Sequence, residues 1–104
     1  MLKINNSQMK EALNNSNDEV SLGLIRKNLR RQFRGLIPRN YGIFPQDVKV
    51  YRMSKSICIE LPSWGSYGYR LALLTLEKEL YKSFVCDTQY YDGKTTFVVR
   101  KCKI

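Results

Sequence analysis

Apolar residues recur along the chain with two different periods, and the first long helical period lies in residues 17–34. Within it an apolar side chain returns every three or four positions, as in an amphipathic helix that packs one face on a core. The members of this stripe are Leu22, Ile25, Leu29 and Phe33. Ser16 and Glu19 have the spacing of a capping box, and Gly35 suits the position that follows a last helical turn. The pattern therefore predicts a helix over about residues 17–34.

A second helical period follows in residues 69–84. Its inner stripe is formed by Ala72, Leu73, Leu76 and Leu80. Leu71, Leu74 and Tyr81 widen the apolar face, so we expect this helix to be the more deeply buried of the two.

Four segments instead alternate between apolar and polar residues, which is the period of a half-buried strand. These segments are residues 47–53, 56–61, 85–91 and 94–103. Ser54 and Lys55 join the first two segments into one hairpin. Asp92 and Gly93 join the last two, and this pair of residues is a strong signal for a two-residue hairpin turn.

The two-residue turn of the last hairpin also fixes its register. It pairs Tyr91 with Lys94 and Tyr90 with Thr95. The face that carries Tyr90 and Thr95 is apolar further along the hairpin, so we assign it to the core. Tyr90 is therefore expected to point inward and Tyr91 outward.

This order of elements predicts an α+β fold with the sequence α-β-β-α-β-β. Two helices would pack on one face of an antiparallel sheet made of the two hairpins. The length of 104 residues fits a single domain that spans residues 1–104. Residues 1–15 are expected to be a loosely attached N-terminal segment, with a short helical turn whose Met9, Ala12 and Leu13 can touch the core.

Net charge narrows the classes of partner. Eighteen Lys and Arg against nine Asp and Glu give a formal charge of +9, which favours nucleic acid, an anionic surface or an acidic protein. The chain has no apolar run long enough for a membrane span, and its first residues lack the apolar region of a signal peptide. We therefore expect a cytoplasmic protein with no membrane partner. No cofactor is predicted, because no phosphate-cradling glycine motif is present.

Cysteine and histidine usage bears on catalysis. The three cysteines are Cys58, Cys86 and Cys102. None forms a CxxC pair and all lie in predicted strands, so buried free thiols are expected. Histidine is absent, which removes the usual general base, the usual activator of a nucleophilic thiol and a common zinc ligand. We accordingly predict a protein that is not an enzyme and holds no metal.

The best catalytic alternative is a metal-dependent nuclease. Such an enzyme needs carboxylates that converge on one cation, often beside a lysine. Asp47 and Lys49 would share one side of a strand, and Glu60 could lie on the neighbouring strand. The same pattern is common cross-strand charge pairing on an exposed sheet face.

The outer face of the helix over residues 17–34 is unusually basic. It carries Arg26, Lys27, Arg30, Arg31 and Arg34, with Arg39 just beyond. No acid lies between Glu19 and Asp47. Like charges four residues apart repel by a few tenths of a kcal/mol per pair, and exposed helices usually mix both signs. The face is either a solvated helix surface or a docking surface for phosphates or an acidic protein, and we favour the docking surface.

A loop in residues 62–69 carries three aromatic side chains among small residues. Trp64 and Tyr67 are candidates for stacking on unpaired bases. The alternative is that they close the end of the core. Tyr69 opens the following helix, and we assign it to the core.

Two stretches carry a resemblance to a known family. The first is the helical run SLGLIRKNLRRQF, residues 21–33, and the second is KSICIELPSW, residues 55–64. With the helix and Tyr-rich hairpin that follow, the chain resembles the large polyvalent protein associated domain type 29 over about residues 21–92. The matching residues are Leu24, Ile25, Arg26, Lys27, Leu29, Phe33, Ser56, Ile57, Ile59 and Trp64.

The chain departs from that family pattern at three places. Cys58 stands where the family has an acid, the tryptophan arrives later, and residues 35–46 lengthen the link from helix to hairpin. The resemblance implies a protein of phages or conjugative elements, of the kind that accompanies incoming DNA and counters host defence.

Together these features predict a small basic non-catalytic binding protein of a phage or mobile element from an AT-rich genome. We expect it to bind nucleic acid, DNA or RNA, through the Arg and Lys face of the helix over residues 17–34, helped by Trp64 and Tyr67. One alternative is a protein inhibitor that docks on a host defence nuclease complex, as anti-CRISPR proteins do. The second alternative is the metal-dependent nuclease.

Overall fold

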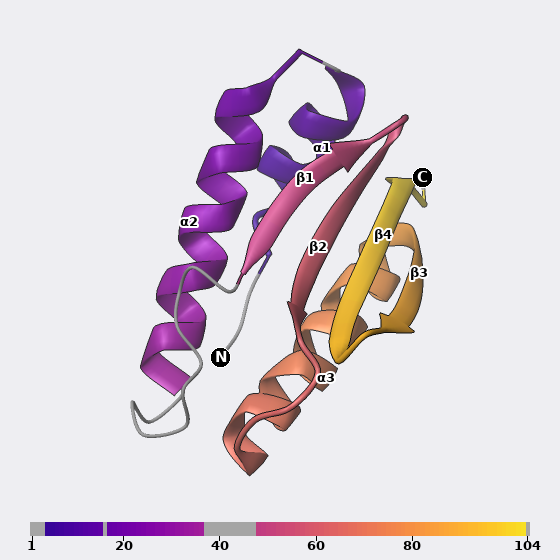
Figure 1. Cartoon of the computed structure of the whole chain (residues 1–104). Helices are drawn as coiled ribbons and strands as arrows, with labels where there is room; N and C mark the ends of the chain where they lie inside the picture. Colours follow the sequence, from indigo (N-terminus) through magenta and orange to yellow (C-terminus); the bar gives the residue numbers. More distant parts are fainter. Residues whose placement is uncertain (1–3, 16, 37–47, 104) are drawn as a thin grey trace.

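The computed structural model describes residues 4–15, 17–36 and 48–103, which form helices and one sheet. The helices are α1 (Asn6–Asn14), α2 (Glu19–Leu36) and α3 (Tyr67–Ser83). The strands are β1 (Lys49–Met53), β2 (Ser56–Pro62), β3 (Phe84–Tyr91) and β4 (Lys94–Cys102) (Figure 1). The predicted α+β class is confirmed, and α1 precedes the predicted order of elements.

The four strands form one antiparallel sheet in the order β1-β2-β4-β3. Both predicted hairpins are present, and pairing of β2 with β4 joins them. The predicted register of the last hairpin is confirmed, with Tyr91 opposite Lys94. In its turn Asp92 has a φ of 54° and Gly93 a φ of 73°. Two successive positive angles are what a type I′ turn requires, and glycine adopts such an angle without strain.

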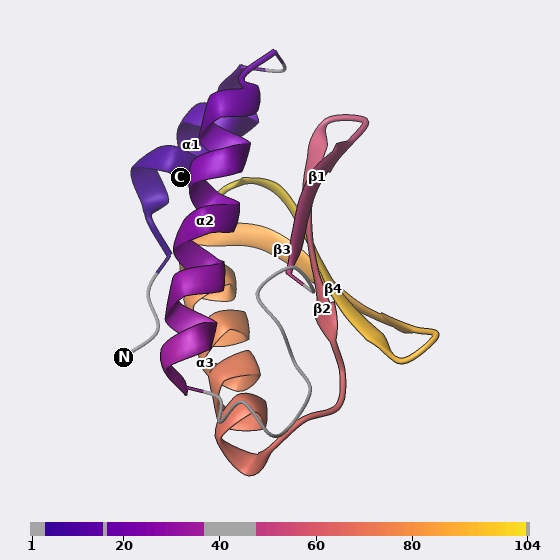
Figure 2. The ribbon, with the colours of Figure 1, turned by 60° about the vertical axis from the view of Figure 1, so that its left-hand side comes forward.

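The three helices lie on one face of the sheet (Figure 2), so the core is a single layer between helices and strands. Alternation along each strand sends every second side chain into this layer. Val50, Ile59 and Phe97 are neighbours across β1, β2 and β4, and each is at most 1% exposed. From the helices, Phe33 of α2 packs against Tyr69 of α3 with ring centroids 5.5 Å apart. Tyr69 is buried, as predicted.

The first helix is an integral part of the core. Met9 and Ala12 of α1 are fully buried. The guanidinium of Arg52 on β1 donates to the carbonyl oxygens of Ala12 at 2.8 Å and of Asn15 at 3.2 Å, at the end of α1 where carbonyls lack helical partners. The expectation of a loosely attached segment over residues 1–15 is therefore wrong for α1. A nine-residue helix is marginal alone, but burial of two side chains and an arginine cap hold this one in place.

The ends of α2 differ from the prediction. The carboxylate of Asp18 accepts hydrogen bonds from the Ser21 hydroxyl at 2.7 Å and the Ser21 N–H at 2.9 Å, so Asp18 caps the helix. The hydroxyl bond first, and then the N–H bond, lower the pKa of Asp18 below its ordinary value of 3.8. Ser16 of the predicted capping box lies outside the described residues. The helix continues to Leu36, so Gly35 lies within its last turn instead of following it.

One side of α3 is more exposed than predicted. Leu71, Leu74 and Tyr81 are 46%, 53% and 37% exposed, so they do not widen the buried face. The sheet and α2 cover only the inner stripe of α3, and this stripe alone fills the contact. Among the described helices, none is long and apolar enough to cross a membrane.

Candidate nucleic-acid interface

The basic face of α2 divides into two rows with different surroundings. In the inner row, Arg26 donates from Nη2 to the Val50 carbonyl oxygen at 2.5 Å, and Arg30 donates from Nε to the Val48 carbonyl oxygen at 3.3 Å. These carbonyls belong to β1 and the residue before it, and β1 is an edge strand, with no partner on its outer side among the described strands. The two arginines therefore satisfy backbone groups that the sheet leaves unpaired.

Arg26 and Arg30, which were predicted to bind a partner, therefore also have a role within the fold. Both side chains are half-buried between α2 and β1, which explains why a helix tolerates like charges four residues apart. Because a carbonyl group is neutral, their positive charges are not cancelled. Of the five N–H donors of each guanidinium, the fold is seen to engage one among the described residues.

The cations of the outer row remain candidates for binding a partner, as predicted. Lys27 and Arg31 are exposed, and they stand one helical turn apart on the solvent side of α2. No ion pair or hydrogen bond engages either side chain within the described part of the chain. Arg34 lies in α2, but its side chain is not described, and Arg39 lies outside the described residues.

The aromatic loop does not close the core. Trp64 and Tyr67 are 76% and 77% exposed, so the alternative of a plug for the core is excluded for both. Tyr69 takes that place, and its hydroxyl donates to the Pro62 carbonyl oxygen. Ser66 starts α3 by accepting a hydrogen bond from the Tyr69 N–H at 3.2 Å. The buried Tyr69 and this cap fix the loop, while its two other rings face solvent.

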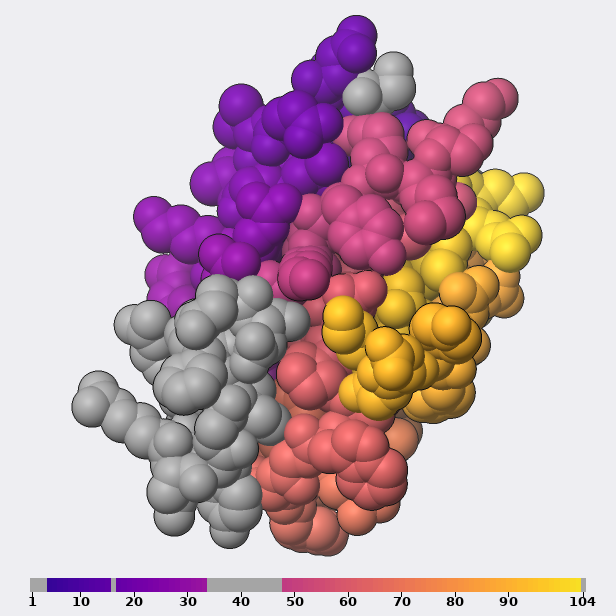
Figure 3. All heavy atoms as spheres, viewed as in Figure 1, coloured from indigo at the N-terminus to yellow at the C-terminus, as the bar shows by residue number. Residues whose placement is uncertain are grey.

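Two hydrogen bonds attach this loop to the tip of the β3–β4 hairpin. The Ser63 N–H donates to the Gly93 carbonyl oxygen at 2.9 Å, and the hydroxyls of Ser63 and Thr95 are 2.8 Å apart. Figure 3 shows the amber hairpin tip directly against the coral surface of the loop and the start of α3. Tyr90 and Tyr91 of that tip are 71% and 85% exposed. Four exposed aromatic rings therefore lie on two chain segments that hydrogen bonds join at one end of the molecule.

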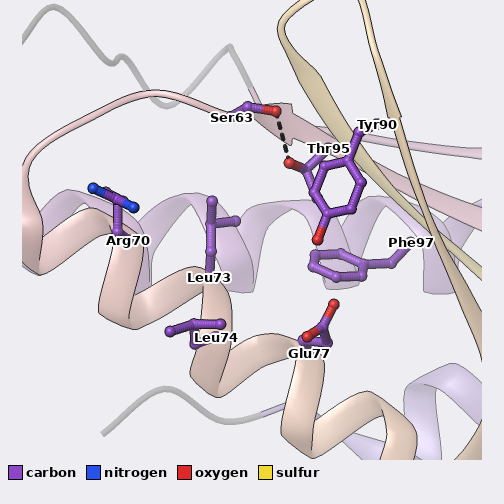
Figure 4. A pocket seen from close by; sticks show the side chains of 8 residues that line it. All are labelled: Ser63, Arg70, Leu73, Leu74, Glu77, Tyr90, Thr95 and Phe97. Carbon is purple, nitrogen blue, oxygen red and sulfur yellow. Dashed lines mark hydrogen bonds between the residues drawn. The ribbon is translucent and has the colours of Figure 1, made fainter.

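The expected inward position of Tyr90 is corrected by this exposure. The register is as predicted, with Tyr90 opposite Thr95, and Thr95 is 4% exposed. Tyr90 occupies the helix side of the sheet but lies on the edge strand near the hairpin tip, where its ring overhangs α3 instead of entering the core (Figure 4).

Exposed cations lie on the same two segments or beside them. Arg70 in the first turn of α3 and Lys94 at the hairpin tip are exposed. The Phe33–Tyr69 contact brings the end of α2 that carries Arg31 beside the start of α3 (Figure 1). Sequence reasoning missed Arg70 and Lys94, since no local signal separates them from ordinary surface charges.

The nuclease alternative gains no support from its described residues. Lys49 and Lys94 each place Nζ 3.8 Å from Oε2 of Glu60, so Glu60 serves cross-strand charge pairing. Asp47 lies outside the described residues. No group of three His, Cys, Asp or Glu side chains that could hold a metal ion occurs in the described ranges.

The thiols are equally unsuited to nucleophilic chemistry. All three cysteines are free, with Cys58 and Cys86 buried and Cys102 half-buried. Burial raises the pKa of the Cys58 thiol, and burial followed by the nearby carboxylates of Asp87 and Glu77 raises the pKa of Cys86 to about 12. A thiolate is the reactive form, and it is disfavoured at both buried positions.

Comparison of the chain with protein-family models, with curated proteins and with solved structures gives no match. The resemblance to the large polyvalent protein associated domain type 29 therefore stays a prediction from the sequence.

Proposed function

We propose that this protein is a non-catalytic module that binds single-stranded nucleic acid. One observation carries the proposal: two segments joined by hydrogen bonds carry four solvent-exposed aromatic rings and two exposed cations, Arg70 and Lys94. These rings are Trp64, Tyr67, Tyr90 and Tyr91. Rings of this kind stack on unpaired bases, at about 1–3 kcal/mol per base, whichever base is present.

The choice of single strands over duplexes follows from the shape of this end. Bases in a duplex are already stacked on each other, so an exposed ring gains little there, whereas an unpaired base offers a free face. The rings come from a loop and a hairpin tip, and neither is a helix that would lie in a major groove.

Exposed side chains supply the phosphate contacts in this proposal. They are Lys27, Arg31, Arg70 and Lys94. Lys94 also pairs with Glu60 at 3.8 Å, an exposed pair of the kind that contributes little and exchanges readily. Four contacts to a single strand correspond to a slope of about −3 in a plot of log K against log salt concentration.

The biological setting is part of the same proposal. A phage or mobile element is supported by the sequence resemblance, and an AT-rich genome by the heavy use of Lys, Asn, Ile and Tyr. A small basic protein of such an element would cover or accompany single strands of its DNA. We also propose that the protein acts in the cytoplasm.

Fluorescence anisotropy of labelled single- and double-stranded DNA and RNA, titrated at several salt concentrations, tests the proposal. We expect single strands to bind more tightly than duplexes, with the slope given above. Stacking should also quench the fluorescence of Trp64, the one tryptophan of the chain.

A pair of truncations locates the binding end. Trp64→Ala should weaken binding of a single strand about tenfold, the effect of losing one stacked base. Val20→Ala removes another apolar side chain, 73% exposed on α2, and should leave binding unchanged. The proposal is overturned if no strand binds at low salt, or if the two variants bind alike.

A protein partner is the second candidate, and a specific observation favours it. Leu71, Leu74 and Tyr81 form an exposed apolar stripe on α3, with 46%, 53% and 37% of each side chain in contact with solvent. An inhibitor of a host defence nuclease would use such a stripe together with nearby arginine and tyrosine side chains. Leu71→Glu should then abolish one stoichiometric complex while single-strand binding persists. If this variant still forms the complex, the stripe is excluded as a docking surface.

A further inference from the structure

A slot lies between the exposed side of α3 and the tip of the β3–β4 hairpin (Figure 4). Its volume is about 220 Å³, below the roughly 300–1,000 Å³ of pockets for drug-sized ligands. The slot is therefore suited to one ring system of a larger ligand. The residues that line it are Ser63, Arg70, Leu73, Leu74, Glu77, Tyr90, Thr95 and Phe97.

Two opposing sides of the slot carry apolar side chains. On the strand side the ring of Tyr90 hangs from β3 with its hydroxyl directed towards α3 (Figure 4). On the helix side Leu73 and Leu74 project from α3, and Phe97 forms a buried floor, 1% exposed. A flat ring in this slot would stack on Tyr90 and contact aliphatic carbon on its other face.

One end of the slot carries an oriented carboxylate. The Thr88 hydroxyl donates to Oε2 of Glu77 at 2.8 Å, and the Tyr81 hydroxyl lies 2.8 Å from the same Thr88 oxygen. This chain fixes the Glu77 side chain. Among the described residues no hydrogen bond reaches its second oxygen, Oε1, which remains able to accept one. The other end of the slot carries the Arg70 guanidinium, directed away from Glu77 towards the loop (Figure 4).

We propose that this slot accepts one unpaired nucleobase that bears an exocyclic amino group, within a single strand. The base stacks on Tyr90, its amino group donates to Glu77, and a neighbouring phosphate pairs with Arg70. Carboxylates accept hydrogen bonds from the amino group of cytosine in this way, whereas thymine and uracil present a carbonyl oxygen that the carboxylate repels. The assignment rests on the proposed function, because it names the base preference of that same end of the molecule.

Binding of ten-nucleotide oligo(dC) and oligo(dT) to the wild-type protein tests the preference. We expect oligo(dC) to bind at least about tenfold more tightly, which is the lower end of the factor for one hydrogen bond to a charged acceptor. In Glu77→Gln the amide oxygen still accepts from Thr88, so the fold is kept while the charge is lost, and the preference should fall to about twofold or less. Glu79→Gln changes the same charge on the opposite side of α3 and should keep the full preference.

Two adjacent tyrosines give a second matched pair. Tyr90→Ala should reduce the preference for oligo(dC), because the base loses the ring that holds it against Glu77. Tyr91→Ala removes a ring on the opposite face of the sheet and should lower affinity for both oligomers without changing their ratio. A reduced ratio in Tyr91→Ala with an unchanged ratio in Tyr90→Ala would overturn the slot.

The remaining outcomes separate this inference from the proposed function. Equal binding of oligo(dC) and oligo(dT) overturns the slot while the single-strand module stands, and failure of both oligomers to bind at low salt overturns both. Cytidine monophosphate is the probe for a free nucleotide. If it displaces oligo(dC) at concentrations near the Kd of the oligomer, the slot serves free nucleotides and the strand assignment is wrong. If it does not displace the oligomer, the assignment to a base within a strand is supported.

Discussion

The basic face of α2 has two rows, and this division predicts different roles for neighbouring cations. The inner row is expected to stabilise the fold, and the outer row to contact a partner. We consider the double variant Arg26→Met with Arg30→Met, which keeps aliphatic side chains between α2 and β1 but removes both guanidinium groups. The variant leaves the Val50 and Val48 carbonyl oxygens without their donors. Its expected effect is a loss of stability and not of partner contacts.

The magnitude follows from the geometry of the two bonds. A hydrogen bond from a charged donor contributes about 1.5–3 kcal/mol. The Arg26 bond is short and part-buried, so we assign it about 1.5–2 kcal/mol. The Arg30 bond, at 3.3 Å, is long, and we assign it about 0.5–1 kcal/mol. A combined loss of about 2–3 kcal/mol lowers the Tm of a domain of this size by roughly 10–20 °C.

Urea and thermal unfolding, followed by circular dichroism, measure this loss. The matched control is Lys27→Met with Arg31→Met, which removes two cations from the same helix but only from its exposed row. Its stability should stay within about 0.5 kcal/mol of the wild type. Because both variants lower the net charge equally, general relief of charge repulsion cannot account for a difference between them. If the control is destabilised as much as Arg26→Met with Arg30→Met, the edge-strand role of the arginines is refuted.

Three further outcomes are expected from the core, the α2 cap and the thiols. Met9→Ala should lower the free energy of unfolding by about 2–4 kcal/mol, because Met9 is fully buried; a change below about 0.5 kcal/mol in urea denaturation would place α1 outside the cooperative unit. The pKa of Asp18 is lowered in the folded protein, so its carboxylate stabilises the fold above the ordinary pKa of 3.8 and this contribution is lost as pH falls through the folded value. Asp18→Asn keeps a capping side chain. Its free energy of unfolding should depend less on pH below about pH 5 than that of the wild type, and an unchanged dependence in this range would contradict the cap. With a thiol-reactive disulfide reagent at pH 8, Cys102 should react before Cys58 and before Cys86, whose pKa is raised to about 12. Mass spectrometry of the modified peptides gives the order of reaction. Early labelling of Cys86 would disagree with its burial.

Much of the fold was predictable because its signals are local. The two periods of apolar residues locate the helices and strands, and each depends on neighbours within the same segment. Asp92 and Gly93 favour a two-residue hairpin turn, and a turn of this length pairs Tyr91 with Lys94. Once one face of a strand is apolar, a shift of register by one residue would expose the whole core face.

The functional end of the molecule was less predictable because it depends on where elements finish relative to one another. Alternation placed Tyr90 on the helix side of the sheet correctly, but it carries no information on whether a helix covers that position. Likewise the sequence shows Arg26 and Arg30 as a basic stripe, and only the placement of β1 at the sheet edge reveals their carbonyl partners. Each arginine and its carbonyl partner are about twenty residues apart, so no local sequence pattern indicates that they meet.

The arginines that hold the fold together also bear on recognition. Arg26, Arg30 and Arg52 all donate to backbone carbonyl oxygens, and a carbonyl has no net charge to offset theirs. Their charges therefore still contribute to the long-range potential that attracts a polyanion, although the fold already uses one or two N–H donors of each guanidinium. We expect the main contacts to individual phosphates to come from fully exposed side chains such as Lys27 and Arg31. A high net charge in a small protein can thus arise from edge protection and helix capping as well as from a binding surface, and the hydrogen-bond partners of each cation decide which of these it serves.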